Sequence, residues 1–413
     1  METIRVGVIG VGRGDSFMHE TIQHIGFKLV AVCDKWQKGL DDLQAKHPDI
    51  ATYQLFEDFL RHDGMDAVVL ANYFHEHAAF AIAAMEAGYH VLSETTPAVT
   101  MAECVALVRA AEKTDKTYML AENYPFTRFN QEMTRRYRAG DIGEVIYAEG
   151  EYNHPASAEM LNWYAPEPSH WRTRMPCTYY STHALAPLMY ATRLMPVSVS
   201  AQALTAGRDE VFHNTYYQQD PGSVILCRMA NGAVFRLFGV SMPGHSIYYR
   251  YHGTRGAMES ERGATEYWGT QRVRVWREEH MLAPGQPREE VYYPEFDEFG
   301  KYAKKTGHGG GDFYVMKEFA DCLRAGKAPL MDVYASAAMS AVAILGWRSA
   351  LAGGKPFTIP DFRDEAARAA YADDHRGPFA ADDVNQEPVS LLPPRAPSLE
   401  EEAYAKTFWI QKE

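Results

Sequence analysis

The sequence predicts an α/β protein in two parts: an N-terminal doubly wound parallel sheet and a C-terminal α/β domain with an open, mainly antiparallel sheet. Up to about residue 124, short and almost wholly apolar runs alternate with helix-period segments, as in a parallel sheet covered on both faces. Between residues 197 and 293, polar and apolar residues alternate instead, and turns such as Asp220-Pro221-Gly222 separate the runs. At 413 residues the chain is long enough for two hydrophobic cores.

The first part should contain five strands with helices between them. The expected strands are the apolar runs at residues 4–9, 29–33, 67–71, 90–93 and 118–121. A glycine-rich turn and a helical stretch to about residue 25 follow the first strand. A helix over 76–87 should end at Gly88, a residue that suits helix C-termini. Thr100 and Glu103 have the spacing of a capping box at the start of the next helix.

The pattern changes after residue 123. The elements expected there are a basic helix over 129–139, a strand over 145–152, a long loop over 153–177, a helix over 180–193, the antiparallel sheet, and two helices over 313–325 and 334–352. From about residue 361 the chain is acidic and rich in proline, so we expect a tail that wraps over the body or a neighbouring subunit. The expected parts are therefore residues 1–124, 125–360 and 361–413.

Composition restricts the class of protein. A net charge of −13 argues against a nucleic-acid partner, because phosphate binding needs a basic surface. No apolar run approaches the roughly 18 residues of a membrane-spanning helix, and we expect no signal peptide and no membrane partner. The five cysteines are scattered without metal-ligand spacing, so we expect reduced, packed thiols in a cytoplasmic protein and no metal site.

A glycine cluster predicts a cofactor site. Gly10-Val11-Gly12-Arg13-Gly14 lies between a strand and a helix, and Asp34 ends the second strand about twenty residues later. Such glycines let the backbone approach a pyrophosphate at a helix N-terminus, and the Asp accepts hydrogen bonds from the adenosine ribose while repelling a 2′-phosphate. A tight turn would also explain the glycines alone, but the strand and the Asp favour NAD. Asp15 replaces the usual third glycine, and Lys35 weakens the preference for NAD over NADP.

Further stretches resemble the Gfo/Idh/MocA oxidoreductases over roughly residues 3–360. They are Ala71-Asn72-Tyr73-Phe74-His75-Glu76-His77, Glu86-Ala87-Gly88-Tyr89-His90-Val91-Leu92-Ser93-Glu94 and Arg138-Ala139-Gly140-Asp141-Ile142-Gly143-Glu144-Val145. The resemblance implies an N-terminal Rossmann domain and a C-terminal α/β domain whose open sheet has a face that commonly makes dimer contacts. It also implies that the NAD site includes Asn72, His77, Glu94 and Asn123.

Two catalytic positions of that family are altered here. Most of its dehydrogenases read Glu-Lys-Pro, with the Lys beside the reacting hydroxyl, whereas this chain reads Glu94-Thr95-Thr96-Pro97. Tyr179 stands where an Asp commonly lies four residues before the catalytic His, which is His183 here. The stretch Tyr180-Ser181-Thr182-His183-Ala184-Leu185-Ala186-Pro187 resembles instead the NAD-dependent α-N-acetylgalactosaminidases of glycoside hydrolase family 109. The segments His308-Gly309-Gly310-Gly311-Asp312-Phe313 and Asp332-Val333-Tyr334 resemble them too.

This resemblance implies a glycosidase that uses NAD without net consumption. In such enzymes hydride leaves C3 of the sugar for the nicotinamide, a base removes the acidified C2 proton, and the aglycone is eliminated from C1; water then adds and hydride returns. His183 is the candidate for the C3 hydroxyl proton. Tyr180, expected one helical turn away on the same face, is the candidate for the C2 proton if a cation lowers its pKa. Glu122 and Tyr152 are further catalytic candidates.

The long loop and the glycine run carry candidate substrate contacts. His170, Arg172 and Arg174 surround Trp171, and the two arginines suit a sulfonate or carboxylate on the sugar, as in NAD-dependent sulfoquinovosidases on this scaffold. A solvated loop or a subunit contact explains them equally well. His308 and Asp312 flank glycines that suit either a loop approaching a sugar or a simple turn before a helix.

Three functions remain open from the sequence. The first is the NAD-dependent glycoside hydrolase. The second is an NAD-dependent sugar or polyol dehydrogenase, which would accumulate NADH. The third is a non-enzymatic sugar or cofactor sensor, which the altered Lys and Asp positions would fit but the retained Tyr180 and His183 would not. The expected partner is a carbohydrate of unspecified identity, anomer and aglycone, and the resemblance alone implies a homodimer or homotetramer.

Overall fold

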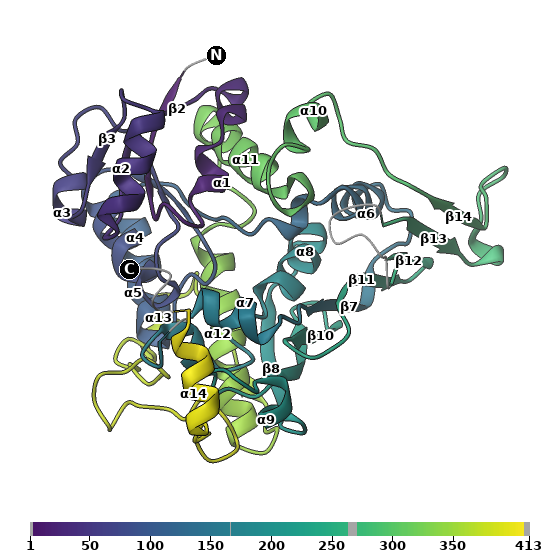
Figure 1. Cartoon of the computed structure of the whole chain (residues 1–413). Coiled ribbons are helices and arrows are strands. Elements are labelled where there is room, and N and C mark those ends of the chain that lie inside the picture. Colours follow the sequence, from purple (N-terminus) through teal and green to yellow (C-terminus); the bar gives the residue numbers. More distant parts are fainter. Residues whose placement is uncertain (1–2, 166, 263–270, 409–413) are drawn as a thin grey trace.

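The chain folds into two β-sheets, each with helices packed against it (Figure 1). The structure is a computed structural model that describes residues 3–165, 167–262 and 271–408. The α/β class expected from the sequence is confirmed. Helix α12 (Val333–Leu351) lies between the sheets, because it contacts β8 of the second sheet and both α5 and β6 of the first. In the described residues no helix is long and apolar enough to span a membrane.

The N-terminal sheet has the strand order β3-β2-β1-β4-β5-β6, and every neighbouring pair is parallel. Its strands are β1 (Ile4–Ile9), β2 (Phe27–Cys33), β3 (Ala51–Tyr53), β4 (Ala67–Leu70), β5 (His90–Ser93) and β6 (Tyr118–Leu120). The order places the first βα turn at the reversal of strand order, where doubly wound sheets bind dinucleotides. Strand β3 is absent from the prediction, because its three half-buried residues are too few to show a period.

The helices of this part are α1 (Asp15–Met18), η1 (Glu20–Ile25), α2 (Gln37–Lys46), α3 (Phe56–Phe59), η2 (Phe74–Glu76), α4 (His77–Glu86), α5 (Met101–Thr114) and η3 (Tyr124–Phe126). The capping box of Thr100 and Glu103 is present, and Gly88 adopts a positive φ just after α4, as expected. The single helical stretch expected to residue 25 is wrong, because His19 has an extended ψ of 141° that separates α1 from η1.

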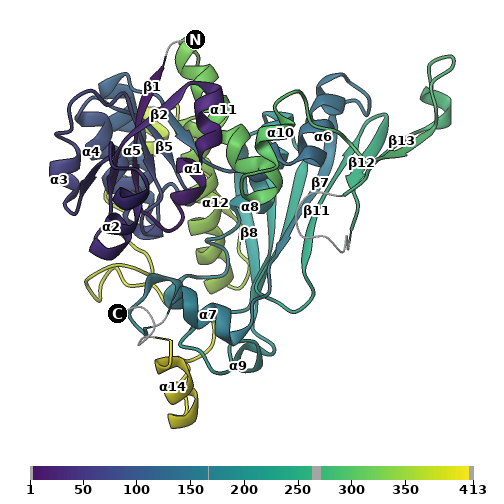
Figure 2. The same ribbon diagram turned by 45° about the horizontal axis from the view of Figure 1, so that its top comes forward.

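The C-terminal sheet has nine strands in the order β14-β13-β12-β11-β7-β10-β9-β8-β15 and is antiparallel apart from the parallel pair β7–β10 (Figure 2). Its strands are β7 (Val145–Asn153), β8 (Pro196–Leu204), β9 (Gly222–Met229), β10 (Val234–Val240), β11 (Ser246–Gly253), β12 (Gly256–Ser260), β13 (Val273–Arg277), β14 (Glu289–Tyr292) and β15 (Phe357–Thr358). One face packs against α6 (Arg128–Arg138), α8 (Thr182–Thr192) and α12.

The region between β7 and α8 differs from its prediction. The expected loop over 153–177 contains α7 (Ala158–Tyr164) and η4 (Trp171–Arg174). The Ser157 hydroxyl accepts a hydrogen bond from the N–H of Met160 and caps α7, a signal that the surrounding Pro and His residues obscured. Helix α8 begins at Thr182, so Tyr180 lies in the preceding turn, and the expectation that it shares a helix with His183 is wrong.

The remaining elements lead into the tail. They are α9 (Arg208–Val211), η5 (Glu279–Met281), α10 (Gly300–Ala303), η6 (His308–Gly310), α11 (Gly311–Ala325), α13 (Glu365–Ala369) and α14 (Leu399–Lys406). Residues 361–408, which we call the tail, run along the molecule to α14, close to α7 and α9 in both views (Figures 1 and 2). The tail therefore lies over the body of its own chain.

Candidate active site

The glycine loop after β1 has the geometry that a dinucleotide pyrophosphate needs. Gly10 has a φ of 95°, and a Cβ on Gly14 would lie 2.0 Å from the carbonyl oxygen of Gly10, so both positions require glycine. A Cβ on Gly12 would meet no protein atom within 4 Å. Gly12 therefore borders open space, and a phosphate group can lie there against the backbone of the loop.

Asp34 lies beside this loop, as expected. Its Oδ2 accepts a hydrogen bond of 2.7 Å from the N–H of Val11, and its Oδ1 accepts one of 2.8 Å from the N–H of Trp36. The carboxylate is only partly buried and keeps lone pairs for ribose hydroxyls. Lys35 points elsewhere, since its Nζ lies 3.0 Å from Glu76.

Buried polar atoms without a protein partner lie on the segments that follow β4 and β6. They are Asn72 Oδ1, His77 Nε2, Glu122 Oε2 and Asn123 Oδ1. His77 donates from Nδ1 to the carbonyl oxygen of Thr96 at 2.9 Å, and burial lowers its pKa, so its Nε2 is an acceptor. Unpaired buried acceptors are costly, which indicates that a ligand with hydrogen-bond donors completes this region. The residues fit NAD.

Replacing Gly12 by Ala is expected to weaken NAD binding about tenfold or more, because the methyl group occupies the space of the pyrophosphate. The fold should be unaffected, since that methyl group meets no protein atom within 4 Å. A calorimetric NAD titration measures the first effect, and thermal unfolding without NAD measures the second. Equal NAD affinity in wild type and variant would contradict the placement of the pyrophosphate at Gly12.

An ion-pair network joins the glycine loop to the start of α11. Arg13 lies 2.6 Å from Glu94 Oε1 and 2.8 Å from Asp312 Oδ1. Asp312, which is fully buried, also accepts from Asn123 at 2.9 Å and lies 2.9 Å from His308 Nδ1. These neighbours hold the pKa of the Asp312 carboxyl well below its usual range against the effect of burial. Arg13 was not among the residues singled out from the sequence.

The ion-pair network gives Asp312 and His308, both predicted to contact the substrate, different surroundings from each other. Asp312 uses its carboxylate for Arg13, Asn123 and His308, so it orients protein groups. His308 is partly exposed, and its ring lies 6.3 Å from that of Tyr124, beside the aromatic cluster described next. Glu94 pairs with Arg13 and also accepts a hydrogen bond of 3.0 Å from the N–H of Thr95. The segments after β5 and β6 and the start of α11 are thereby fixed together.

The four predicted catalytic side chains converge near the N-terminus of α8. His183 Nδ1 lies 2.6 Å from Oε1 of the fully buried Glu122. The ring of Tyr152 is 4.5 Å from that of His183, the ring of Tyr180 is 4.9 Å away, and Tyr124 adds a third phenol at 4.7 Å. Because Glu122 accepts a hydrogen bond from the Nδ1–H group, Nε2 is the ring nitrogen that can exchange a proton with a ligand.

The acidity of Tyr180 differs from what its predicted role requires. Burial raises the pKa of Tyr180, and the charges of Arg172 and Arg13 lower it in part. Burial also raises the pKa of Tyr152 well above its usual value. Both phenols are therefore protonated in this structure at neutral pH, and a base role for either one needs additional positive charge.

Of the substrate candidates in the loop before α8, Trp171 and Arg172 contact aromatic rings, whereas Arg174 is exposed. Trp171 is buried and stacks on Phe74 at 4.9 Å, and the Arg172 guanidinium lies over the ring of Trp171 at 4.4 Å and that of Tyr164 at 5.4 Å. No ion pair between described residues involves Arg172. Arg174 is exposed, and no contact between described residues joins it to the cluster.

Thr95 and Tyr179, which stand at the two altered positions, both form hydrogen bonds within the protein. Thr95 Oγ1 lies 2.6 Å from Thr182 Oγ1 at the start of α8, where a Lys would otherwise stand. Tyr179 is fully buried, and its hydroxyl donates to the carbonyl oxygen of Val99 at 3.2 Å. Neither residue replaces the missing Lys or Asp chemically.

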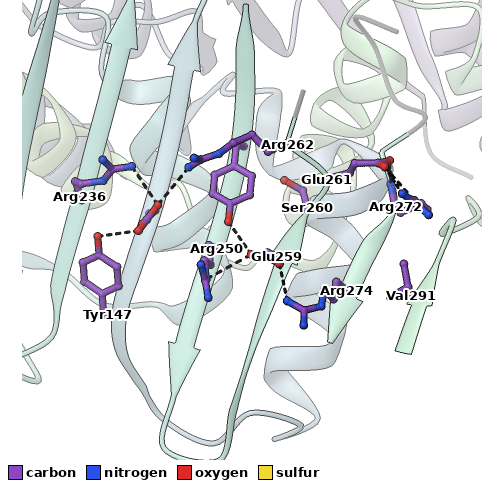
Figure 3. Close-up of a pocket in the computed structure, with 12 residues that line it drawn as sticks. Tyr147, Arg236, Arg250, Glu259, Ser260, Glu261, Arg262, Arg272, Arg274 and Val291 are labelled. Carbon is purple, nitrogen blue, oxygen red and sulfur yellow. Dashed lines mark hydrogen bonds and ion pairs between the residues drawn. The ribbon is translucent and has the colours of Figure 1, made fainter. Parts of the chain in front are cut away.

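A separate hollow of about 600 Å³ lies on the C-terminal sheet (Figure 3). Charged side chains on β7, β10, β11, β12 and β13 line it. Several of them pair with each other: Arg274 lies 3.0 Å from Glu259, as Figure 3 shows, and Arg236 lies 3.1 Å from Glu149. None of the lining residues belongs to the cluster around His183. In the described residues no group of three or more His, Cys, Asp or Glu side chains is placed to hold a metal ion.

Two family models match the chain. The model for the NAD-binding Rossmann fold of the Gfo/Idh/MocA oxidoreductase family matches residues 4–122, and the model for the C-terminal domain of glycosyl hydrolase 109 matches residues 201–368. An α-N-acetylgalactosaminidase from Shewanella oneidensis is 28% identical in an alignment that covers 88% of this chain and 85% of that protein.

Solved structures share the fold. A levoglucosan dehydrogenase in complex with NADH and L-sorbose has a TM-score of 0.70 at 18% identity, covering 87% of this chain and 100% of that one. An oxidoreductase from Agrobacterium radiobacter in complex with NAD⁺, L-tartaric acid and magnesium has a TM-score of 0.68 at 15% identity, covering 86% and 98%. Together with the matches over both domains, the glycine loop and Asp34 identify the cofactor as NAD. The chain is an NAD-dependent enzyme whose N-terminal part is similar to the Gfo/Idh/MocA oxidoreductases and whose C-terminal part is similar to glycosyl hydrolase 109.

Proposed function

We propose that the protein is an NAD-dependent glycoside hydrolase that works by transient oxidation at C3 of the sugar. One observation carries this proposal: the Glu122-bound His183 lies within 5 Å, ring to ring, of both Tyr152 and Tyr180. A simple alcohol oxidation needs one proton acceptor, whereas an oxidation coupled to elimination needs two at neighbouring carbons. The match to the glycosyl hydrolase 109 domain supports the same reading.

His183 is the proposed acceptor for the C3 hydroxyl proton. Glu122 fixes the ring with Nδ1 toward the carboxylate, so Nε2 receives the proton and returns it at the end of the cycle. NAD held by the glycine loop and Asp34 would supply the hydride acceptor for C3 and would be regenerated in each turnover. The buried Glu122 also stabilises the imidazolium that forms when His183 takes up the proton.

Tyr180 is the proposed base for the C2 proton. The C3 ketone acidifies that proton, and after Tyr180 removes it the electron pair forms the C1–C2 double bond while the C1–O bond to the aglycone breaks. Water then adds its hydroxide to C1, its remaining proton neutralises the aglycone oxygen, and Tyr180, after exchanging its proton with solvent, protonates C2. Arg172 and Arg13 lower the pKa of Tyr180 against the effect of its burial. Tyr152 stays protonated through burial and is the proposed donor to the developing enolate.

Replacing Arg172 by Ala is expected to move the rising limb of the activity–pH profile to higher pH by about one unit. Burial, Glu94 and Glu122 raise the pKa of Tyr180, and Arg172 opposes them, so its loss raises that pKa further. The active phenolate then forms only at higher pH. Arg174→Ala, which removes an exposed Arg from the same turn, is the control and should leave the limb unchanged. An unshifted limb for Arg172→Ala would exclude Tyr180 as the base.

Turnover of nitrophenyl glycosides tests the function. The panel contains α and β anomers of neutral, N-acetylated, carboxylated and sulfonated sugars, because the unpaired guanidinium of Arg172 suits an acidic substituent. Nitrophenol and NADH are followed separately. We expect nitrophenol release that requires NAD, without NADH accumulation, and its loss in Tyr180→Phe. Stoichiometric NADH from free sugars without nitrophenol would favour the dehydrogenase instead.

We also propose that the charged face of the C-terminal sheet joins two copies of the chain. Acidic and basic side chains lie beside one another across this face, with Arg250 3.4 Å from Glu259 (Figure 3) and Arg262 2.8 Å from Glu151. An interface between two identical copies related by a twofold axis uses the same patch on both, so each copy would offer both charges to the other. Sedimentation should give a dimer for the wild type and for Arg61→Glu, an exposed control on the N-terminal part, but a monomer for Arg262→Glu. A dimer that survives Arg262→Glu would contradict this interface.

A further inference from the structure

The tail is attached to the body through buried polar contacts. The Nε1–H of the fully buried Trp347 donates to the carbonyl oxygen of Pro388 at 2.7 Å. Arg348, also buried, pairs with Asp374 at 2.6 Å and with Glu387 at 2.8 Å. Contacts of this kind hold a segment in one place, because breaking one leaves a buried charge without its partner. Most of the tail lies beyond residue 368, where the second family match ends.

One part of the tail holds the segment before β9. Ser390 Oγ donates to the fully buried Asp220 at 2.6 Å, and the N–H of Leu391 donates to the same carboxylate at 3.0 Å. The N–H of Arg395 donates to Gln218 Oε1 at 2.7 Å. The Arg395 guanidinium, whose side chain is 5% exposed, donates to the carbonyl oxygens of residues 215 and 217 at 3.0 and 3.3 Å.

That segment in turn holds the turn that carries Arg172. The N–H of Gln218 donates to the carbonyl oxygen of Thr173 at 2.9 Å. The side-chain amide of Gln219, which is buried, donates to the carbonyl oxygen of Arg172 at 3.1 Å. A continuous set of hydrogen bonds therefore runs from Ser390 and Arg395, through 215–220, to the backbone of Arg172.

A second part of the tail reaches the same turn from the cofactor side. The ring of Phe379 stacks on His75 at 5.3 Å and meets the edge of Phe74 at 6.5 Å. Phe74 stacks on Trp171 at 4.9 Å and lies 6.3 Å from Tyr180. The turn of Trp171 and Arg172 is thus supported on both sides by residues that the tail contacts.

We propose that the tail positions Arg172 and Trp171 for the reaction, with Phe379, Ser390 and Arg395 as its positioning residues. None of the three touches the cluster around His183; they act through Phe74, Gln218 and Asp220. The role assigned to Arg172 rests on the proposed function, in which its charge lowers the pKa of Tyr180. The tail keeps that guanidinium within reach of the phenol, and a shift of about 1 Å in such a group is enough to cost activity.

Arg395→Ala in the full-length protein is the main test. We expect faster hydrogen exchange of the amides at 170–174 and a kcat/KM that falls about tenfold. NAD affinity should stay within about twofold, because the glycine loop is untouched. The matched control is Arg376→Ala, which removes an exposed Arg of the same tail whose ion pair, among the described residues, is with Asp374. It should change none of the three quantities. Arg395→Lys keeps a donor for one of the carbonyls and should recover part of the loss.

Two further variants, Ser390→Ala and Phe379→Ala, test the same contacts of the tail. If Arg395→Ala does not fold, Ser390→Ala removes a single hydroxyl, and Phe379→Ala tests the contact on the cofactor side; each should raise exchange at 170–174. Unchanged exchange there in the folded variants would overturn the proposal. If the wild type cleaves no glycoside, the proposed function fails, whereas the exchange measurement still decides whether the tail holds this turn.

Discussion

Replacing His183 by Ala should lower kcat by about a hundredfold to ten-thousandfold, the usual contribution of a positioned acid–base group. The imidazole, held 2.6 Å from Glu122, is the acceptor for the C3 hydroxyl proton in the proposed reaction. Without it the alkoxide needed for hydride transfer forms only by loss of its proton to water. Steady-state turnover of the glycoside identified in the panel measures the effect.

The controls for His183→Ala separate chemistry from folding. His280→Ala removes an exposed imidazole near the far edge of the C-terminal sheet and should leave kcat unchanged. NAD affinity should be retained in both variants, because neither residue borders the glycine loop. A kcat for His183→Ala within about threefold of wild type would remove His183 from the proton transfer, since general acid–base groups contribute far more than that.

Replacing Asp312 by Asn should lower the free energy of unfolding by about 3–5 kcal/mol. The buried carboxylate accepts from Arg13 and Asn123 and pairs with His308, and its loss leaves Arg13 with Glu94 alone. Urea denaturation at pH 7 measures the change. Asp321→Asn is the control on the same helix, because its exposed pair with Lys317 should contribute less than about 0.5 kcal/mol.

The Asp312 prediction has a defined pH dependence. The folded protein holds the pKa of this carboxyl well below its usual range, so the group stabilises the fold at every pH above its unfolded pKa, about 3.9. The difference between wild type and Asp312→Asn should therefore be constant from pH 7 to about pH 5 and shrink only as the pH falls below about 4. A difference that vanishes already at pH 6 would show that the carboxylate is not stabilised by its neighbours.

Strand periodicity made most of the fold predictable. The continuous apolar runs of β1 and β4 are buried along almost their full length, and β10 alternates buried and half-buried residues as the sequence suggested. β3, with three residues, and α7, with seven, were not predicted, because such short segments show too little of a strand or helix period. The residues around them are also typical of loops. The position of Tyr180 depends on where α8 begins, and helix boundaries are less well encoded than helix interiors.

The site was predictable only where a local motif marks it. The glycine loop, Asp34 and His183 stand in recognisable patterns, whereas the role of Arg13 depends on Asp312, which is 299 residues away in the chain. An Arg in a glycine-rich turn is ordinarily expected to be solvated, so only the folded structure shows that it joins the loop to α11. The contacts of the tail are equally invisible, because single polar residues such as Ser390 form no pattern in the sequence.

Isotope labelling of the product tests the central claim most directly. The substrate carries deuterium at C3 and is hydrolysed in ordinary water, and a second sample without label is hydrolysed in D₂O. The proposed cycle predicts that the product keeps deuterium at C3, because the same hydride returns, and that the D₂O sample gains one deuterium at C2, because that proton is lost and replaced. A product with no deuterium at C2 would contradict elimination and, with it, the proposed function.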